Sequence, residues 1–254
     1  MQQTTTPKTR LFSPDSLAAA SEVWLSGEQT KYLTRVLRLN IEDTLIVFDG
    51  NGGQYRAVIK ELAKDRALLH VGEHFAADIE SPLPIHLVQG ISRGGRMDVV
   101  IQKSTELGVR RITPAITEFS VVKLDDDRAA NRHEHWRKVS QSACEQCGRN
   151  TLPEIEPPQK LAHWLNEYKS ATTTRIMLDP QSGESISQLA EPKNGVVLLI
   201  GPEGGLSDAE RTQCVESGFR PVTLGPRILR TETAAVAGIA VLQTLWGDFG
   251  QVYA

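Results

Sequence analysis

The sequence predicts an α/β fold in which a domain built on a parallel sheet follows a small β-rich domain. Up to residue 80, short apolar runs alternate with turn residues, as in a compact β-barrel. From residue 85 onward, apolar runs of strand length alternate with segments of helical periodicity, which is typical of a parallel sheet covered by helices. Residues 81–84 contain two prolines, each of which favours extended backbone in the preceding residue. We therefore expect domains at 1–80 and 81–254.

Turn residues separate the expected strands of the first domain. The clearest turn is 49–53, because Asn51, Gly52 and Gly53 tolerate positive φ angles between two apolar runs. One helix is expected within 27–40, where apolar residues recur at helical spacing. The expected strands lie at 23–25, 44–50, 55–62 and 66–75.

The second domain alternates strands and helices along the chain. Its strand at 195–201 is apolar at five consecutive positions, as a strand covered on both faces requires. The other expected strands are 85–91, 111–117, 175–179 and 220–225, and the expected helices are 98–108, 135–148, 160–168, a helix after Ser207, and 231 to about 246.

The composition is that of an ordinary globular chain. Its 254 residues are 40% hydrophobic and 23% charged, which excludes collagen, coiled-coil and low-complexity classes. No apolar run approaches the roughly 18 residues of a membrane-spanning helix, and the polar opening lacks the apolar stretch of a signal peptide, so we expect no membrane partner and a cytoplasmic location. The chain has 28 basic and 31 acidic residues, so it would need a local basic patch to bind a nucleic acid.

The most informative motif is a glycine-rich turn at 201–205, which follows a buried strand and precedes a helix. Ser207 and Glu210 form a capping box that fixes the start of this helix. A glycine turn at the carboxyl end of a parallel strand is where open α/β sheets bind ligands, because glycine lets the backbone approach closely. The alternative is a tight strand-to-helix connection that binds nothing.

This turn fits neither of two familiar nucleotide-binding loops. No lysine follows the glycines, as a P-loop requires, and the dinucleotide pattern G-x-G-x-x-G is absent. Glu203 would repel a pyrophosphate, so the turn favours a ligand with a neutral or positive part.

A second turn, at 224–230, follows the strand at 220–225. It holds Arg227 and Arg230, with Glu232 just beyond, and Thr231 is the expected N-cap of the last helix. Charged residues in an ordered turn are often functional. The helix is rich in alanine and glycine, which allows close packing on another helix or subunit, although simple core packing explains it equally well.

Four separated motifs give the chain a resemblance to a known family. GPEGG at 201–205, LGPRILRTETA at 224–234, QKSTELGV at 102–109 and SACEQCGRN at 142–150 resemble the ribosomal RNA small subunit methyltransferase E family, which belongs to the SPOUT class. KTRLF at 8–12 and KYLTRVLR at 31–38 extend the resemblance into the first domain.

The resemblance implies a fold and a reaction that the residue patterns do not show. The fold is a PUA-like RNA-binding barrel followed by a trefoil-knotted SPOUT domain that carries the cofactor site and a homodimer interface. The reaction is methyl transfer from S-adenosylmethionine to N3 of a uridine in 16S ribosomal RNA of the small ribosomal subunit. A non-catalytic ribosome-assembly factor on the same fold and a SPOUT enzyme acting on another RNA position remain alternatives.

The resemblance also assigns residues to roles. For the chemistry, we expect Arg230 to stabilise charge on the base and Glu232 to orient or deprotonate it, unless the two pair with each other across the dimer. The residues expected at the cofactor are Leu178, Pro180, Ile200, Gly201, Pro202, Glu203, Gly204, Gly205, Leu224, Gly225, Ile228, Leu229 and Thr233. The residues expected at RNA are Arg10, Arg35, Arg38, Arg93, Arg96, Lys103, Arg149 and Asn150.

No metal is expected, although Cys144 and Cys147 form a CxxC pair. They lie in a helical pattern, and no second pair supplies the other half of a zinc site. The three cysteines are also too few for a disulfide framework.

Overall fold

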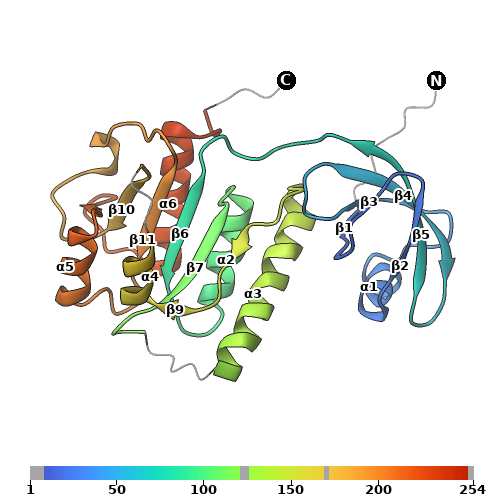
Figure 1. The fold of residues 1–254 in the computed structure, drawn as a ribbon, viewed down its shortest axis with the longest axis horizontal. Coiled ribbons are helices and arrows are strands. Elements are labelled where there is room, and N and C mark those ends of the chain that lie inside the picture. Colours follow the sequence, from blue (N-terminus) through green and yellow to red (C-terminus); the bar gives the residue numbers. More distant parts are fainter. Residues whose placement is uncertain (1–8, 121–125, 169–171, 251–254) are drawn as a thin grey trace. The chain divides into compact units, whose positions relative to one another are not determined.

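The computed structural model describes residues 9–120, 126–168 and 172–250 (Figure 1). They divide into two compact units. One holds the described chain up to Glu80 together with Cys144–Leu152, and the other holds Ser81–Ala143 and the described chain from Pro153 onward. Each unit has its own hydrophobic core.

The nine residues Cys144–Leu152 differ from expectation, because the sequence placed them in the second domain. Two buried side chains account for the difference. The Arg149 guanidinium pairs with Glu80 at 2.5 Å, and the Asn150 amide donates a hydrogen bond to the carbonyl of Ala77 at 2.8 Å. Both partners belong to the first unit, so these residues group with it.

The first unit is a five-stranded sheet in the order β1-β3-β4-β5-β2 among the residues described. Its strands are β1 (Arg10–Phe12), β2 (Ser21–Leu25), β3 (Thr44–Phe48), β4 (Gln54–Leu62) and β5 (Ala67–Phe75). The expected turn joins β3 to β4, with positive φ angles at Gly50, Gly52 and Gly53. The expected helix is shorter than its pattern: α1 (Gly27–Lys31) runs into a π-helical turn (Tyr32–Val36), and Arg38 then adopts a positive φ of 55°.

The second unit is built on a parallel sheet whose described strands have the order β12-β10-β11-β6-β7-β8, with β9 also pairing with β7. These strands are β6 (Ile85–Gly90), β7 (Arg111–Ile116), β8 (Glu154–Ile155), β9 (Gln159–Lys160), β10 (Thr174–Leu178), β11 (Val196–Ile200) and β12 (Arg220–Val222). The helices are α2 (Arg96–Glu106), α3 (Asp126–Cys147), α4 (Leu161–Glu167), α5 (Asp208–Glu216) and α6 (Thr231–Trp246), with a short 3₁₀ turn at Ile186–Gln188. The last residues of α3, from Cys144 onward, group with the first unit. The sequence did not predict β8, β9 or the 3₁₀ turn.

Both faces of this sheet are covered, as the apolar strand at 196–200 predicted. Alternate residues of β11 enter two different cores: Leu198 packs with residues of α2 and α6, whereas Leu199 packs with residues of α4 and α5. Because β11 lies between β10 and β6, it is the central strand beside which the site forms.

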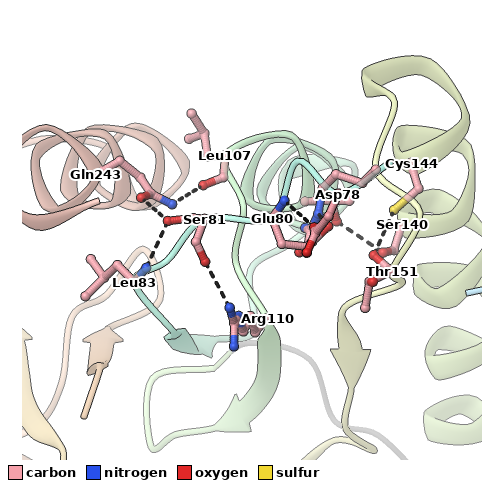
Figure 2. A network of polar contacts seen from close by, with 12 residues as sticks. Asp78, Glu80, Ser81, Leu83, Leu107, Arg110, Ser140, Cys144, Thr151 and Gln243 are labelled. Atoms are coloured by element: carbon pink, nitrogen blue, oxygen red, sulfur yellow. Dashed lines mark hydrogen bonds and ion pairs between the residues drawn. The ribbon is translucent and has the colours of Figure 1, made fainter. Parts of the chain in front are cut away.

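The far end of α6 is fixed by a buried glutamine (Figure 2). The Gln243 amide donates to the carbonyl of Leu107 at 2.7 Å, and its oxygen accepts from the Ser81 hydroxyl at 2.7 Å. Arg110 in turn donates to the carbonyl of Ser81 at 2.9 Å. Since Gln243 and Ser81 are buried and paired, they hold the helix that carries Arg230 and Glu232 at its other end.

Candidate active site

Three adjacent strand ends of the second unit surround a cleft of about 640 Å³. The strands β12, β10 and β11 are neighbours and run parallel, so the segments that follow them lie at one edge of the sheet. The cleft is lined by the end of β10, by the turn at 201–205 and by the turn at 224–230 together with the start of α6. The two glycine turns recognised in the sequence therefore face one cavity.

Most of the residues expected at the cofactor line this cleft. They are Leu178, Pro180, Ile200, Gly201, Pro202, Glu203, Gly204, Gly205, Leu224, Ile228 and Leu229. Arg230 and Glu232 line it as well, whereas Gly225 and Thr233 are not among its lining residues. Leu224 and Ile228 contribute apolar surface on the side of the second turn, where Ile228 is 87% exposed.

The first turn depends on a glycine in a different strand. A Cβ atom on Gly90, the last residue of β6, would lie 2.4 Å from the nitrogen of Pro202. The turn therefore passes against β6 at a distance that only glycine permits. The turn itself closes through a hydrogen bond from the Gly205 N–H to the Pro202 carbonyl at 2.9 Å, with Gly205 at a φ of 75°.

The helix after this turn begins as predicted. The Glu210 N–H donates to the Ser207 hydroxyl oxygen at 3.3 Å, and the Glu210 carboxylate accepts from the Ser207 N–H at 3.0 Å, which completes the capping box.

The start of α6 corrects the expectation for Thr231. The N-cap is Arg230, which makes no side-chain cap, and Thr231 is the first helical residue. Its hydroxyl donates instead to the carbonyl of Gly201 at 2.7 Å and accepts from the side chain of Gln89 at 2.8 Å. Because this hydroxyl joins the two turns, it is not available to cap its own helix.

Glu203 is held in its ionised form beside the cleft. Its Oε1 accepts from the backbone N–H of Arg93 at 3.0 Å and pairs with the Arg96 guanidinium at 2.6 Å. Burial acts to raise the pKa of Glu203, but the hydrogen bonds from Arg93, from its own backbone and from Arg96 outweigh it, so the pKa lies below its ordinary value. This side of the cleft therefore holds an ionised carboxylate that is paired with the Arg96 guanidinium.

Glu232 presents a carboxylate oxygen that lacks a partner. Its Oε1 lies 3.9 Å from the Nε of Arg96, while its Oε2 is buried and has no hydrogen-bond partner among the residues that the structure describes. Buried acceptors are nearly always paired, so an unpaired one beside a cleft is suited to a donor from a ligand.

The end of β10 adds a charged pair that sequence reasoning missed. Asp179 is buried, and its carboxylate pairs with the Arg211 guanidinium of α5 at 2.5 Å. Both residues line the cleft. The signal in the sequence was an aspartate directly after an apolar strand, but its partner lies 32 positions further along the chain.

The residues expected at RNA fall into different environments. Arg149 and Asn150 are buried, and the Arg10 guanidinium donates to the Asn150 side chain at 2.6 Å and contacts Gln54 within the first unit. These three side chains are engaged in internal contacts, so a role in binding RNA directly is not supported for them. Arg35, Arg38 and Arg93 are exposed, Lys103 pairs with Glu106 at 2.8 Å, and Arg96 lies at the cleft.

The described residues contain no cluster of three or more histidine, cysteine or acidic side chains arranged for a metal, and no helix among them is long and apolar enough to cross a membrane. Burial raises the pKa of the Cys144 thiol to about 12, so this cysteine of the CxxC pair stays protonated.

Comparison with known proteins identifies the family. Residues 79–243 match the family model of the RNA methyltransferase domain, and residues 25–71 match that of the RNA methyltransferase PUA domain. The chain is 38% identical over 240 residues to ribosomal RNA small subunit methyltransferase E of Buchnera aphidicola subsp. Acyrthosiphon pisum, which covers 94% of each chain. It is 30% identical to the protein of the same name from Bacillus subtilis, covering 86% of this chain and 88% of that protein.

Two solved structures agree in fold. A putative methyltransferase from Legionella pneumophila, in complex with S-adenosylmethionine, superposes with a TM-score of 0.90 at 38% identity, covering 95% of this chain and 99% of that one. Ribosomal RNA small subunit methyltransferase E from Neisseria gonorrhoeae, also bound to S-adenosylmethionine, gives a TM-score of 0.88 at 40% identity, with the same coverage of both chains. The predicted fold class, a PUA-like barrel followed by a SPOUT-type parallel-sheet domain, is confirmed, while the trefoil knot stays a prediction. The chain belongs to the ribosomal RNA small subunit methyltransferase E family of RNA methyltransferases.

Proposed function

We propose that this protein methylates N3 of a uridine in 16S ribosomal RNA of the small ribosomal subunit, with S-adenosylmethionine as the methyl donor. The observation that carries the proposal is the cleft in which Glu232 offers an unpaired, buried carboxylate oxygen beside two glycine turns. A ribosomal substrate would place the protein in the cytoplasm, and the family resemblance implies that it acts as a homodimer.

The cleft suits the proposed cofactor in size and in charge. Its volume falls within the range of roughly 300–1,000 Å³ that is typical of small-molecule sites. Gly201, Gly204 and Gly205 leave their backbone groups accessible, and Leu224 and Leu229 supply apolar surface for a nucleoside. The ionised Glu203 would repel a phosphate but attract a ligand that carries an ammonium or sulfonium group.

S-adenosylmethionine supplies a methyl group on a sulfonium, which makes that methyl readily transferable. The chain must then remove a proton, because N3 of uridine is mostly protonated at neutral pH. We assign this step to the Glu232 carboxylate, which lines the cleft and accepts the N3 proton as the new N–C bond forms and the S–C bond breaks. S-adenosylhomocysteine is the remaining product.

Arg230 is assigned to the charge that develops on the base. As N3 loses its proton, negative charge spreads to the two carbonyl oxygens of uridine, and a guanidinium is a strong donor to such oxygens. Arg230 lines the cleft two residues before Glu232, so both groups belong to the same wall.

RNA contacts are assigned to exposed cations. We keep Arg35 and Arg38 on the first unit, and Arg93 and Lys103 on the second, as phosphate contacts. We also propose that residues 1–80 act as the RNA-binding domain and that 81–254 carry the cofactor site and the dimer interface, apart from the nine residues that join the first unit.

The test is to map the methylated nucleotide. Purified protein is incubated with isotopically labelled S-adenosylmethionine and small ribosomal subunits that lack the modification, and mass spectrometry then locates the label. We expect label on N3 of one uridine of 16S RNA, and subunits that already carry the modification serve as the control. Label at another position would identify a different target. RNA binding without any label would favour a non-catalytic assembly factor and overturn the proposal.

A further inference from the structure

Arg96 contacts both sides of the cleft. It is the first residue of α2, placed there by a turn in which Gly94 has a φ of 59°. One terminal nitrogen of its guanidinium lies 2.6 Å from Glu203, in the turn after β11. Its Nε lies 3.9 Å from Glu232, in the first turn of α6. A single side chain therefore spans the two segments that carry the proposed cofactor and base contacts.

A second, deeper connection joins the same two segments. The Thr231 hydroxyl donates to the carbonyl of Gly201, and the buried side chain of Gln89 donates to Thr231. This connection fixes the backbone at the floor of the cleft. It does not reach the carboxylates of Glu203 and Glu232. Arg96 lies beside both, and the backbone N–H of Arg93 also donates to Glu203.

The local charges argue against a phosphate contact at Arg96, which the sequence had predicted. Two carboxylates lie within 4 Å of one guanidinium, so the group as a whole is negative rather than positive. An incoming phosphate would be repelled by both.

Solvent exposure indicates what Arg96 contributes. Its side chain is 44% exposed, against 28% for Glu203 and 19% for Glu232. Exposed ion pairs contribute little to the stability of a fold, because water screens them. Their effect here is to hold two carboxylates in defined positions.

We propose that Arg96 is a positioning residue for methyl transfer, which holds Glu203 for the cofactor and orients the Glu232 carboxylate for the base. This role rests on the proposed function of the cleft. Arginine suits it because its planar guanidinium presents separate N–H groups to two partners, which the single ammonium of lysine does not.

Two variants of Arg96 distinguish its contact with Glu203 from its contact with Glu232. All measurements use the full-length protein. We expect Arg96→Gln to raise the Kd for S-adenosylmethionine about tenfold and to lower kcat about 100-fold, because misplacement of catalytic groups by about 1 Å is enough for such a loss. Arg96→Lys retains a charge for Glu203, so its Kd should return to within about threefold of the wild-type value while kcat stays low. Calorimetry gives Kd, and methylation of unmodified subunits gives kcat and KM.

The controls test for folding and for a general effect of charge. Arg137→Gln removes an exposed arginine that pairs with Glu134 on α3, and it should change neither Kd nor kcat. Thermal unfolding of both Arg96 variants should match that of the wild type. Combining Arg96→Gln with Glu203→Gln should raise Kd no further than the more severe single change, because the two residues act through one contact.

Several outcomes would overturn the role of Arg96. Unchanged Kd and kcat in Arg96→Gln would do so. A rise in KM for RNA alone, with a weaker dependence of that KM on salt, would identify Arg96 as a phosphate contact instead. If the wild type binds S-adenosylmethionine but methylates no RNA, the proposed function fails, and the Kd values still decide whether Arg96 positions Glu203. If the wild type does not bind S-adenosylmethionine, both proposals fail.

Discussion

Arg230 and Glu232 have separate predicted roles although only one residue lies between them. Arg230 precedes the helix as its N-cap, and Glu232 lies in its first turn. If Arg230 stabilises charge only as the base is deprotonated, Arg230→Ala should retain cofactor affinity and lose turnover about 100-fold. Calorimetry and methylation assays measure the two quantities, and Arg230→Lys tests whether charge alone suffices. Wild-type turnover in Arg230→Ala would remove this residue from the mechanism.

Gly90 is a second single residue on which the site depends, although it does not line the cleft. A Cβ at this position would meet the backbone of Gly201 and Pro202, which has no flexible end that can move away. We therefore expect Gly90→Ala to displace the turn and to weaken S-adenosylmethionine binding at least about tenfold. Gly183→Ala is the matched control, because a Cβ there meets nothing within 4 Å. Equal affinities in the two variants would contradict the close approach.

At the scale of the elements, the buried side chain of His86 lies where β6, β7 and α4 pack together. His86 of β6 bonds to the Thr113 hydroxyl of β7 at 2.7 Å, and its ring packs edge-on against Trp164 of α4. Burial, with the positive charge of Arg111, lowers the pKa of His86 from 6.5 to about 3. Between these two values the unfolded chain binds a proton that the folded chain does not, so stability falls as pH falls below about 6.5.

This linkage predicts a measurable difference in stability. Between pH 7.5 and pH 5, the wild type should lose about 2 kcal/mol more of its free energy of unfolding than His86→Gln. Urea unfolding at both values measures this, and comparing differences removes the effect of the other titrating groups. If the wild type and His86→Gln lost equal amounts of their free energy of unfolding, the pKa of His86 would not differ between the folded and unfolded chains as described.

At the scale of the whole molecule, α6 offers a surface on which a second copy of the chain could pack. Its buried residues, among them Ala235 and Ile239, face the core of its own unit, whereas Ala237 and Ala240 are only partly covered. Small side chains allow a second helix to approach closely, which agrees with the homodimer implied by the family resemblance. Light scattering should then give about twice the 28.0 kDa of one chain. Ala240→Arg should halve this mass, Ala130→Arg on α3 should not, and a monomeric wild type would contradict the prediction.

Local patterns in the sequence predicted much of the fold, because each depends on neighbours along the chain. The capping box at Ser207 and the positive φ angles at Gly52 and Gly53 are properties of short segments, and both are confirmed. The strand at 196–200 was recognisable because a covered strand must be apolar at every position. The strands β8 and β9 have two residues each, which is too short for an alternation of apolar and polar residues, so the sequence did not predict them.

Patterns along the chain were therefore enough to predict the α/β class, most of the helices and strands, and the two turns that line the cleft. Contacts between side chains that are distant in the chain could be identified only from the fold. Arg149 was predicted to contact RNA, but its side chain is buried and paired with Glu80. Arg96 was predicted to contact RNA as well, and in the fold it lies beside Glu203 and Glu232. A charged side chain acquires its role from partners within a few ångströms, and in a parallel sheet those partners come from strands far apart in the chain.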